Sequence, residues 1–197
     1  GVRIGHDVVL DTQTDRYLVT KHVRTPLGNL PMTLPRPYPA WPHFAADEIA
    51  EEHPILFRLP GISLLWPSSV RVTREAADND QIKARVLVRS TDGAWSQSDN
   101  FQLDPTQEED AWLTQRESSG NQGRYPVVAE LVGSFSSHFA ESGRPAGDDD
   151  DVDASDLEHL TESSAPSRIL VVGDADFLNV QYVGSQRRPR HTPSNLT

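Results

Sequence analysis

Residues 168–178 read RILVVGDADFL, and this stretch decides the expected fold. Four apolar residues in succession precede a glycine and two aspartates. A continuous apolar run without polar alternation is typical of a strand covered on both faces, as in a sheet between helices. Ligands of open α/β sheets bind beyond the carboxyl ends of such strands. We therefore expect an α/β fold with RILVVG inside a helix-covered sheet. The candidate binding residues at its end are Gly173, Asp174, Asp176 and Phe177.

The rest of the chain supports a mixture of strands and helices. Val, Leu and Ile are concentrated in residues 83–90, 125–135 and 168–174, which we predict to be strands, with weaker candidates at 17–23 and 62–67. Acidic sequence next to proline predicts helices at 44–54 and 105–115. A third helix is expected to begin at Asp174.

We predict a single α/β domain over residues 1–184, followed by a disordered tail over 185–197. Residues 24–43 contain six prolines, which remove amide donors and fix φ, so this stretch is expected to be an extended connector. Its aromatic residues Tyr38 and Trp41 are a second candidate binding surface. Residues 141–167 combine an acidic run with Ser, Gly and Pro, which predicts a flexible loop.

Composition excludes several classes of function. The formal net charge of −11 repels phosphate backbones, so we expect no nucleic-acid partner. The absence of cysteine excludes thiol catalysis and disulfides. No apolar run reaches the roughly 18 residues of a membrane helix. The start, GVRIGHDVVL, resembles the interior of a domain, which suggests an excised fragment whose targeting signals lie outside it.

The acidic run does not form a recognisable calcium loop. Asp149, Asp151 and Asp153 alternate like the first ligands of an EF-hand. That motif then requires glycine and glutamate, where this chain has Ala154 and Leu160. A solvated acidic loop is the favoured interpretation.

Histidine and serine motifs also fail to predict a catalytic or metal site. No two histidines have the spacing of helical or strand metal sites, and the G-x-S-x-G turn of a serine hydrolase is absent. Ser134, Ser136, Ser137 and His138 are close in sequence, but a catalytic histidine also needs a separate orienting acid. We expect no catalytic residue, no metal and no cofactor. The histidines are His6, His22, His43, His53, His138, His159 and His191.

Asp174 and Asp176 leave two interpretations open. They can be Mg²⁺ ligands, or they can cap a helix by accepting main-chain N–H groups at its N-terminus. Capping is favoured, because one strand end cannot supply a full magnesium shell and no other acidic pair follows a convincing strand.

Several segments, taken in order, resemble one family. They are GVRIGHDVVLD (1–11), PYPAWPHF (37–44), HPILFRLPGISLLWPSS (53–69), GRYPVVAELVGSFSSHFAE (123–141) and RILVVGDADFL (168–178). Together they resemble the extracytoplasmic domain of gliding-motility-type (GldG-like) auxiliary proteins of bacterial ABC transporters. The resemblance implies a Rossmann-like or glutamine-amidotransferase-like layered sheet without established enzyme activity. After Tyr182 the family continues into a helix and a membrane span, whereas SQRRPRHTPSNLT (185–197) does neither.

The resemblance and the failed motifs lead to one main functional expectation. The chain is expected to be a non-enzymatic, periplasmic interaction domain of an inner-membrane protein, with membrane subunits of an ABC transporter as partners. Its membrane attachment would lie in segments outside this chain, and self-association is left open. Two alternatives remain: a carbohydrate-binding or hydrolytic domain using Asp174 and Asp176, and a spacer between the membrane and a partner.

Overall fold

The computed structural model describes residues 1–26, 28–50, 52–142 and 160–178. The strands within these ranges are β1 (Val2–Ile4), β2 (Val8–Leu10), β3 (Thr14–Thr25), β4 (Gly28–Ala45), β5 (Gly61–Ser63), β6 (Val70–Val72), β7 (Ile82–Arg89), β8 (Trp95–Gln97), β9 (Pro126–Gly133) and β10 (Ser167–Val172). The helices are α1 (Arg74–Ala77), α2 (Glu109–Ser119) and the 3-10 helix η1 (Ala46–Glu48). No helix among the described residues has both the length and the apolar content to cross a membrane.

The strands form small open sheets. Two sheets have three strands, in the orders β10-β9-β7 and β3-β4-β5, and β1-β6 and β2-β8 form two-stranded sheets. A mixed α/β chain with open sheets is thereby confirmed, although strands predominate. Every pairing among the described strands is antiparallel. Rossmann-like sheets are mostly parallel, so these pairings give no support to that part of the prediction.

The strand expected inside a sheet lies at its edge. Among the described strands, β10 pairs only with β9, from Ser167 opposite Gly133 to Val172 opposite Val128. Ile169 and Leu170 are 42% and 39% exposed. The prediction of an interior, helix-covered strand was therefore wrong. Only the end of the run is covered, where Val172 packs against the core.

The core of the described part of the chain consists of two hydrophobic clusters. The first cluster packs between the β7–β9 sheet and the base of β4 and includes Val9, Phe44, Leu64, Leu87 and Val127. The second cluster packs between β2, β8, the base of β4 and α2, and consists of Leu10, Tyr38, Ala40, Leu65, Trp95 and Trp112. β2 and β4 contribute to both clusters, so they tie the two halves together.

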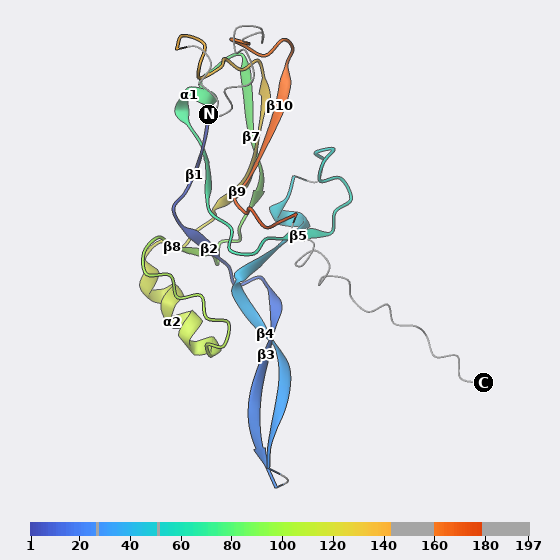
Figure 1. Cartoon of the computed structure of the whole chain (residues 1–197), viewed down its shortest axis with the longest axis vertical. Coiled ribbons are helices and arrows are strands. Elements are labelled where there is room, and N and C mark those ends of the chain that lie inside the picture. The colour runs from blue at the N-terminus through green and yellow to red at the C-terminus, as the bar shows by residue number, and fades with distance from the viewer. Residues whose placement is uncertain (27, 51, 143–159, 179–197) are drawn as a thin grey trace, which may run out of the picture.

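A long β-hairpin projects from this body. β3 pairs with residues 28–42 of β4, from Thr25 opposite Gly28 to Thr14 opposite Pro42, with a break in register between Thr14 and Arg16. Figure 1 shows the two strands extending away from the remaining elements, with α2 beside the hairpin base. The proline-rich stretch 24–43 is extended, as predicted, but it is chiefly a paired strand rather than a connector.

Of the two helices predicted at 44–54 and 105–115, only the second is present. Residues 44–54 do not form an α-helix: β4 continues to Ala45, where Phe44 pairs with Ile62 of β5 and is fully buried, and only η1 follows. Burial of Phe44 outweighs the helical preference of the acidic residues after it. The helix predicted at 105–115 exists but spans Glu109–Ser119, because Asp104 first accepts the N–H and the hydroxyl of Thr106 in a turn.

The helix predicted to begin at Asp174 is absent from the described residues, since 174–178 contain only bends and turns. Its continuation beyond residue 178 lies outside them. The same holds for most of the acidic loop, residues 143–159, and for the predicted tail at 185–197. The described end of that loop returns to the body through a bridge between Glu162 and Ser136.

Candidate functional site

The two candidate binding surfaces are joined by residues 64–68. The main-chain N–H of Leu65 donates to Oδ2 of Asp174 at 3.0 Å. The indole N–H of Trp66 donates to the hydroxyl oxygen of Tyr38 at 2.9 Å. The structure thus brings together residues that the sequence placed in separate regions. We call this region the junction; it comprises Tyr38, Trp41, residues 64–68 and residues 173–177.

Asp174 is the polar centre of the junction. It is 6% exposed, and its second oxygen, Oδ1, accepts the main-chain N–H of Asp176 at 2.7 Å. Burial raises the pKa of the Asp174 carboxyl, although the N–H groups of Asp176 and Leu65 favour the ionised form and act in the opposite direction. Both carboxyl oxygens therefore have main-chain partners. Asp174 fastens residues 64–68 to the end of β10, which is the turn-stabilising role rather than a helix cap.

Replacing Asp174 with asparagine is expected to lower the free energy of unfolding by about 2 kcal/mol. The amide keeps one acceptor oxygen, so its NH₂ group must face one of the two main-chain N–H groups. Urea denaturation at neutral pH measures the loss. Because the pKa of Asp174 is raised by folding, its ionisation opposes folding. The free energy of unfolding of the wild type should therefore fall as pH rises through the raised pKa, while that of the variant does not. The difference between the two proteins should narrow over this pH range. A difference that widens as pH rises would contradict the raised pKa of Asp174.

Gly173 provides the close approach that makes this contact possible. Its N–H donates to the carbonyl of Val127 at 2.9 Å, and its carbonyl accepts the N–H of Ser68 at 2.7 Å. A Cβ atom at this position would lie 2.0 Å from the carbonyl oxygen of Ser68. The candidate binding glycine is thus needed for backbone packing.

Tyr38 is buried, contrary to the expectation of an exposed aromatic connector. It is 2% exposed, and its hydroxyl donates to the carbonyl of Leu103 at 2.6 Å. Burial raises the pKa of the Tyr38 phenol, and the hydrogen bond from Trp66 partly offsets the rise. Tyr38 was misassigned because the prolines around it suggest a loop, whereas the chain pairs as β4 and directs this ring into the second cluster. Trp41 is half-buried against the same cluster.

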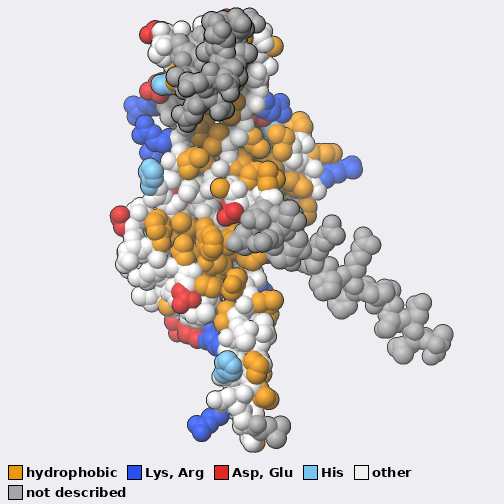
Figure 2. All heavy atoms as spheres, in the orientation of Figure 1, with side chains coloured by type: hydrophobic (Ala, Val, Ile, Leu, Met, Phe, Trp, Pro, Cys, Tyr) orange, Lys and Arg blue, Asp and Glu red, His pale blue; other side chains and the backbone are white. Residues whose placement is uncertain are grey.

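The surface of the junction is aromatic and apolar. Trp66 is 42% exposed and has a left-handed backbone with φ of 55°. Leu178, directly after the junction, is 74% exposed, while Asp176 and Phe177 are partly covered. Figure 2 shows hydrophobic side chains gathered over the middle of this face of the molecule, above the hairpin. The most exposed side chains at and beside the junction are therefore apolar.

Sequence reasoning missed a buried ionic cluster on the β7–β9–β10 sheet. Glu130 of β9 is 5% exposed, and both of its carboxyl oxygens lie 3.0 Å from Nε2 of His53. Nδ1 of His53 accepts the N–H of Ile55, so Nε2 carries the proton that is donated to Glu130. Arg168 of β10 adds an ion pair to Glu130 at 3.0 Å. The available signal was a single carboxylate inside the apolar run VVAELVG.

This cluster holds an apolar loop against the sheet. Leu56 is buried beside His53, whereas Ile55 and Phe57 are 45% and 61% exposed. Arg58 lies over the ring of Phe57, with its guanidinium carbon 5.1 Å from the ring centroid. Both ring nitrogens of His53 have partners, Glu130 and the N–H of Ile55, and these contacts position the loop. No serine hydroxyl is hydrogen-bonded to His53 in the described part of the chain, so the pair lacks the partner of a hydrolytic triad.

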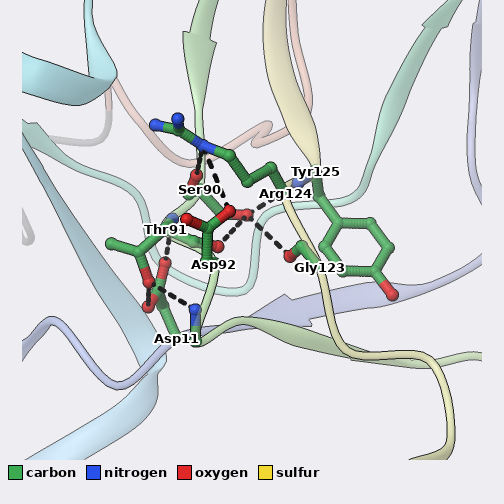
Figure 3. A network of polar contacts seen from close by, with 8 residues as sticks. Asp11, Ser90, Thr91, Asp92, Gly123, Arg124 and Tyr125 are labelled. Atoms are coloured by element: carbon green, nitrogen blue, oxygen red, sulfur yellow. Dashed lines mark hydrogen bonds and ion pairs between the residues drawn. The ribbon is translucent and has the colours of Figure 1, made fainter.

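A second buried polar network lies at the C-terminal end of β7, where Ser90 and Thr91 follow the strand. The carboxylate of Asp11 accepts the N–H of Thr91 at 2.8 Å and its hydroxyl at 2.6 Å. The hydroxyl of Ser90 accepts the N–H of Tyr125 at 2.7 Å, and Arg124 donates to the carbonyl of Ser90 at 3.1 Å. Figure 3 shows these groups facing one another around the turn after β7. Each contact satisfies main-chain or turn groups, so the network stabilises the fold.

A pocket of about 310 Å³ opens between the hairpin base and α2. Its walls include Trp95, Trp112 and Pro37. The indole N–H of Trp95 has no hydrogen-bond partner among the described residues. The pocket contains none of the predicted binding residues.

The described residues include no group of three or more His, Asp or Glu side chains placed to share a metal ion. The serine and histidine cluster predicted to be non-catalytic lies after β9. Its Ser137 hydroxyl accepts the N–H of Phe139, and the exposed His138 ring packs edge-on against the Phe139 ring. The DDDD run lies outside the described residues.

Comparison with known proteins identifies the family. A family model described as an ABC-type uncharacterized transport system matches residues 1–196. No curated protein and no solved structure matches the chain. Because the match covers nearly the whole chain, the protein belongs to this family of auxiliary components of ABC-type transport systems.

Proposed function

We propose that this chain is a non-enzymatic interaction domain that binds membrane subunits of an ABC transporter through the junction. Family membership over residues 1–196 supports a role within such a system. The gliding-motility subtype is proposed from the resemblance of the five segments quoted above. A Rossmann-like or glutamine-amidotransferase-like layered sheet is likewise proposed from that resemblance alone.

The surface chemistry of the junction carries this proposal. Its most polar buried group, Asp174, has both oxygens bound to main-chain N–H groups. Trp66 and Leu178 are exposed beside it. Exposed tryptophan on a fixed backbone is characteristic of protein–protein contact residues, because it buries a large area at little cost in conformational entropy.

We also propose that the domain lies outside the cytoplasm and is attached to the membrane through segments not included in this chain. The family resemblance supports this placement. Self-association of the chain is a further part of the proposal. Labelling of engineered surface cysteines in intact cells with a membrane-impermeant reagent would test the location, and labelling only after lysis would contradict it.

Exchanging Leu178 for aspartate, or Trp66 for alanine, is expected to reduce copurification of the transporter membrane subunits by about thirtyfold, which corresponds to the loss of one hot-spot contact of about 2 kcal/mol. The matched control is Leu160→Asp, because Leu160 is 61% exposed and lies near the opposite end of β9. Circular dichroism of each variant establishes that the fold is retained. Unchanged copurification in both the Leu178 and the Trp66 variant would favour the spacer alternative. Sugar or metal binding that is lost in Asp174→Asn would favour the carbohydrate-binding or hydrolytic alternative.

A further inference from the structure

The two outer edges of the β3/β4 hairpin differ in their hydrogen-bonding capacity. Pro31, Pro35 and Pro37 of β4 lie opposite His22, Leu18 and Arg16 of β3. Proline has no N–H to give to a partner strand, so these are the non-hydrogen-bonded pairs of the ladder. Such pairs alternate with hydrogen-bonded ones, and their main-chain polar groups point away from the hairpin.

The outer edge of β4 therefore lacks many of the N–H donors that a further strand would need, whereas the outer edge of β3 has them. We call the β4 edge blunted. On β4, the outward positions 31, 35 and 37 lack donors, and only Asn29 and Thr33 retain one in the outer part of the strand. On β3, the outward N–H groups of Leu18, Thr20, His22 and Arg24 are all present. β3 is the end strand of its sheet in the described structure. A continuous row of donors and acceptors on an end strand is a template for another strand.

The hairpin also has one apolar face. Directly opposite residues share a face of a sheet, so Val19 with Leu34 and Val23 with Leu30 line the same side. The exposed fractions of Val23, Leu30 and Leu34 are 36%, 48% and 40%, whereas Val19, nearer the hairpin base, is only 3% exposed. Near the base, Glu108 covers this face through ion pairs with Lys21 and Arg36, which lower the pKa of Glu108 to about 2. The outer part of the face remains open. The opposite face is mixed: the Thr20 and Thr33 hydroxyls are hydrogen-bonded at 2.9 Å, and Leu18 beside them is 65% exposed.

Charge indicates what kind of strand would pair there. No acidic residue occurs between Arg16 and Asp47, although the whole chain has a net charge of −11. Arg16, His22 and Arg24 occupy outward positions of β3. The edge is therefore basic on an acidic protein, and an acidic partner is attracted to it.

We infer that the outer edge of β3 binds an extended, acidic segment of a partner protein by strand addition. The partner alternates apolar residues, which continue the exposed face of Val23 and Leu30, with acidic residues opposite Arg16 and Arg24. Main-chain hydrogen bonds provide affinity and the side chains provide selection. This surface is distinct from the junction, so it does not depend on the proposed function.

Two other occupants fit the edge less well. Symmetric antiparallel pairing of two copies about Thr20 would place Arg16 of one copy opposite Arg24 of the other, and like charges in opposed positions are destabilising. Insertion into a lipid bilayer would leave the outward N–H groups of β3 without partners, which is costly in hydrocarbon. A protein strand satisfies both the charges and the main-chain groups.

The test uses the blocked peptide acetyl-EVETTITVE-amide, which has the proposed alternation. Fluorescence anisotropy would measure its binding to the whole chain. Thr20→Pro removes an outward N–H from β3 and is expected to weaken binding about tenfold through the loss of its main-chain hydrogen bond and the neighbouring pairing. Thr33→Pro is the matched control. It removes an outward N–H from the blunted edge and breaks the same Thr20–Thr33 hydroxyl bond, so binding should change less than about twofold.

The outcomes are distinguishable. Amide resonances of Leu18, Thr20, His22 and Arg24 should shift on peptide binding, and the charge-reversed peptide acetyl-KVKTTITVK-amide should not bind. Equal loss in the two proline variants, or no binding of the acidic peptide, would overturn the inference. Binding to vesicles containing anionic lipid, with no response to the peptide, would assign the hairpin to a membrane surface. Concentration-dependent dimerisation lost in Thr20→Pro would assign it to a second copy. Circular dichroism checks that both variants retain the hairpin.

Discussion

Replacing Glu130 with alanine is expected to lower the free energy of unfolding by about 3 kcal/mol. The buried N–H of His53 would lose both carboxyl oxygens that lie 3.0 Å from it, and an unsatisfied buried donor costs about 1–3 kcal/mol. Loss of the buried methylenes of Glu130 adds about 1 kcal/mol or more. Urea denaturation measures the total. Proteolysis within residues 52–59 should accelerate as well, because His53 no longer fixes this loop.

Two variants separate the contribution of His53 from that of Arg168. Glu130→Gln keeps one acceptor for Nε2 of His53 and should lose only about 1 kcal/mol. Arg168→Ala removes an ion pair whose arginine side chain is 48% exposed, so it should lose less than about 1 kcal/mol. A loss in Arg168→Ala as large as that in Glu130→Ala would show that the ion pair, not the histidine contact, fixes the cluster.

The strands of the main sheet were predictable because their signals are local. Residues 83–90, 125–135 and 168–174 are rich in branched apolar residues, and each contains a strand within one or two residues of its predicted limits. Branched side chains fit a pleated surface wherever the strand lies. The same signal does not specify the neighbours of a strand. RILVVG was therefore recognised as a strand but assigned to the interior, and it lies at the edge.

The candidate site could be predicted only in part, because its decisive contacts join distant segments. Asp174 and Gly173 were selected as strand-end residues, but their partners, Leu65 and Ser68, lie more than a hundred positions earlier in the chain. Nothing in the local sequence around Glu130 names His53 as its partner. The prolines of residues 24–43 indicated an extended chain. Pairing with β3 also requires Pro31, Pro35 and Pro37 to occupy outward positions of the ladder, which the local sequence does not specify.

Introducing alanine at Gly173 is expected to destabilise the protein by about 3 kcal/mol, at the upper end of the usual cost of overpacking. Its Cβ would lie 2.0 Å from the carbonyl oxygen of Ser68. A main-chain oxygen cannot rotate away as a flexible side chain can, so the end of β10 must separate from residues 64–68. The hydrogen bonds from Ser68 to Gly173 and from Leu65 to Asp174 would lengthen or break together.

Gly120→Ala is the comparator, because a Cβ atom at Gly120 meets no atom within 4 Å and only its φ of 65° opposes the substitution. That left-handed strain should cost about 1 kcal/mol. Thermal unfolding ranks the two variants, and amide exchange at Leu65 and Ser68 locates the damage. If the junction has separated, exchange at both amides accelerates in Gly173→Ala and stays at the wild-type rate in Gly120→Ala. Equal destabilisation with protected amides would mean that residues 64–68 yield without separating. The junction would then be too compliant to act as the fixed surface that partner binding requires.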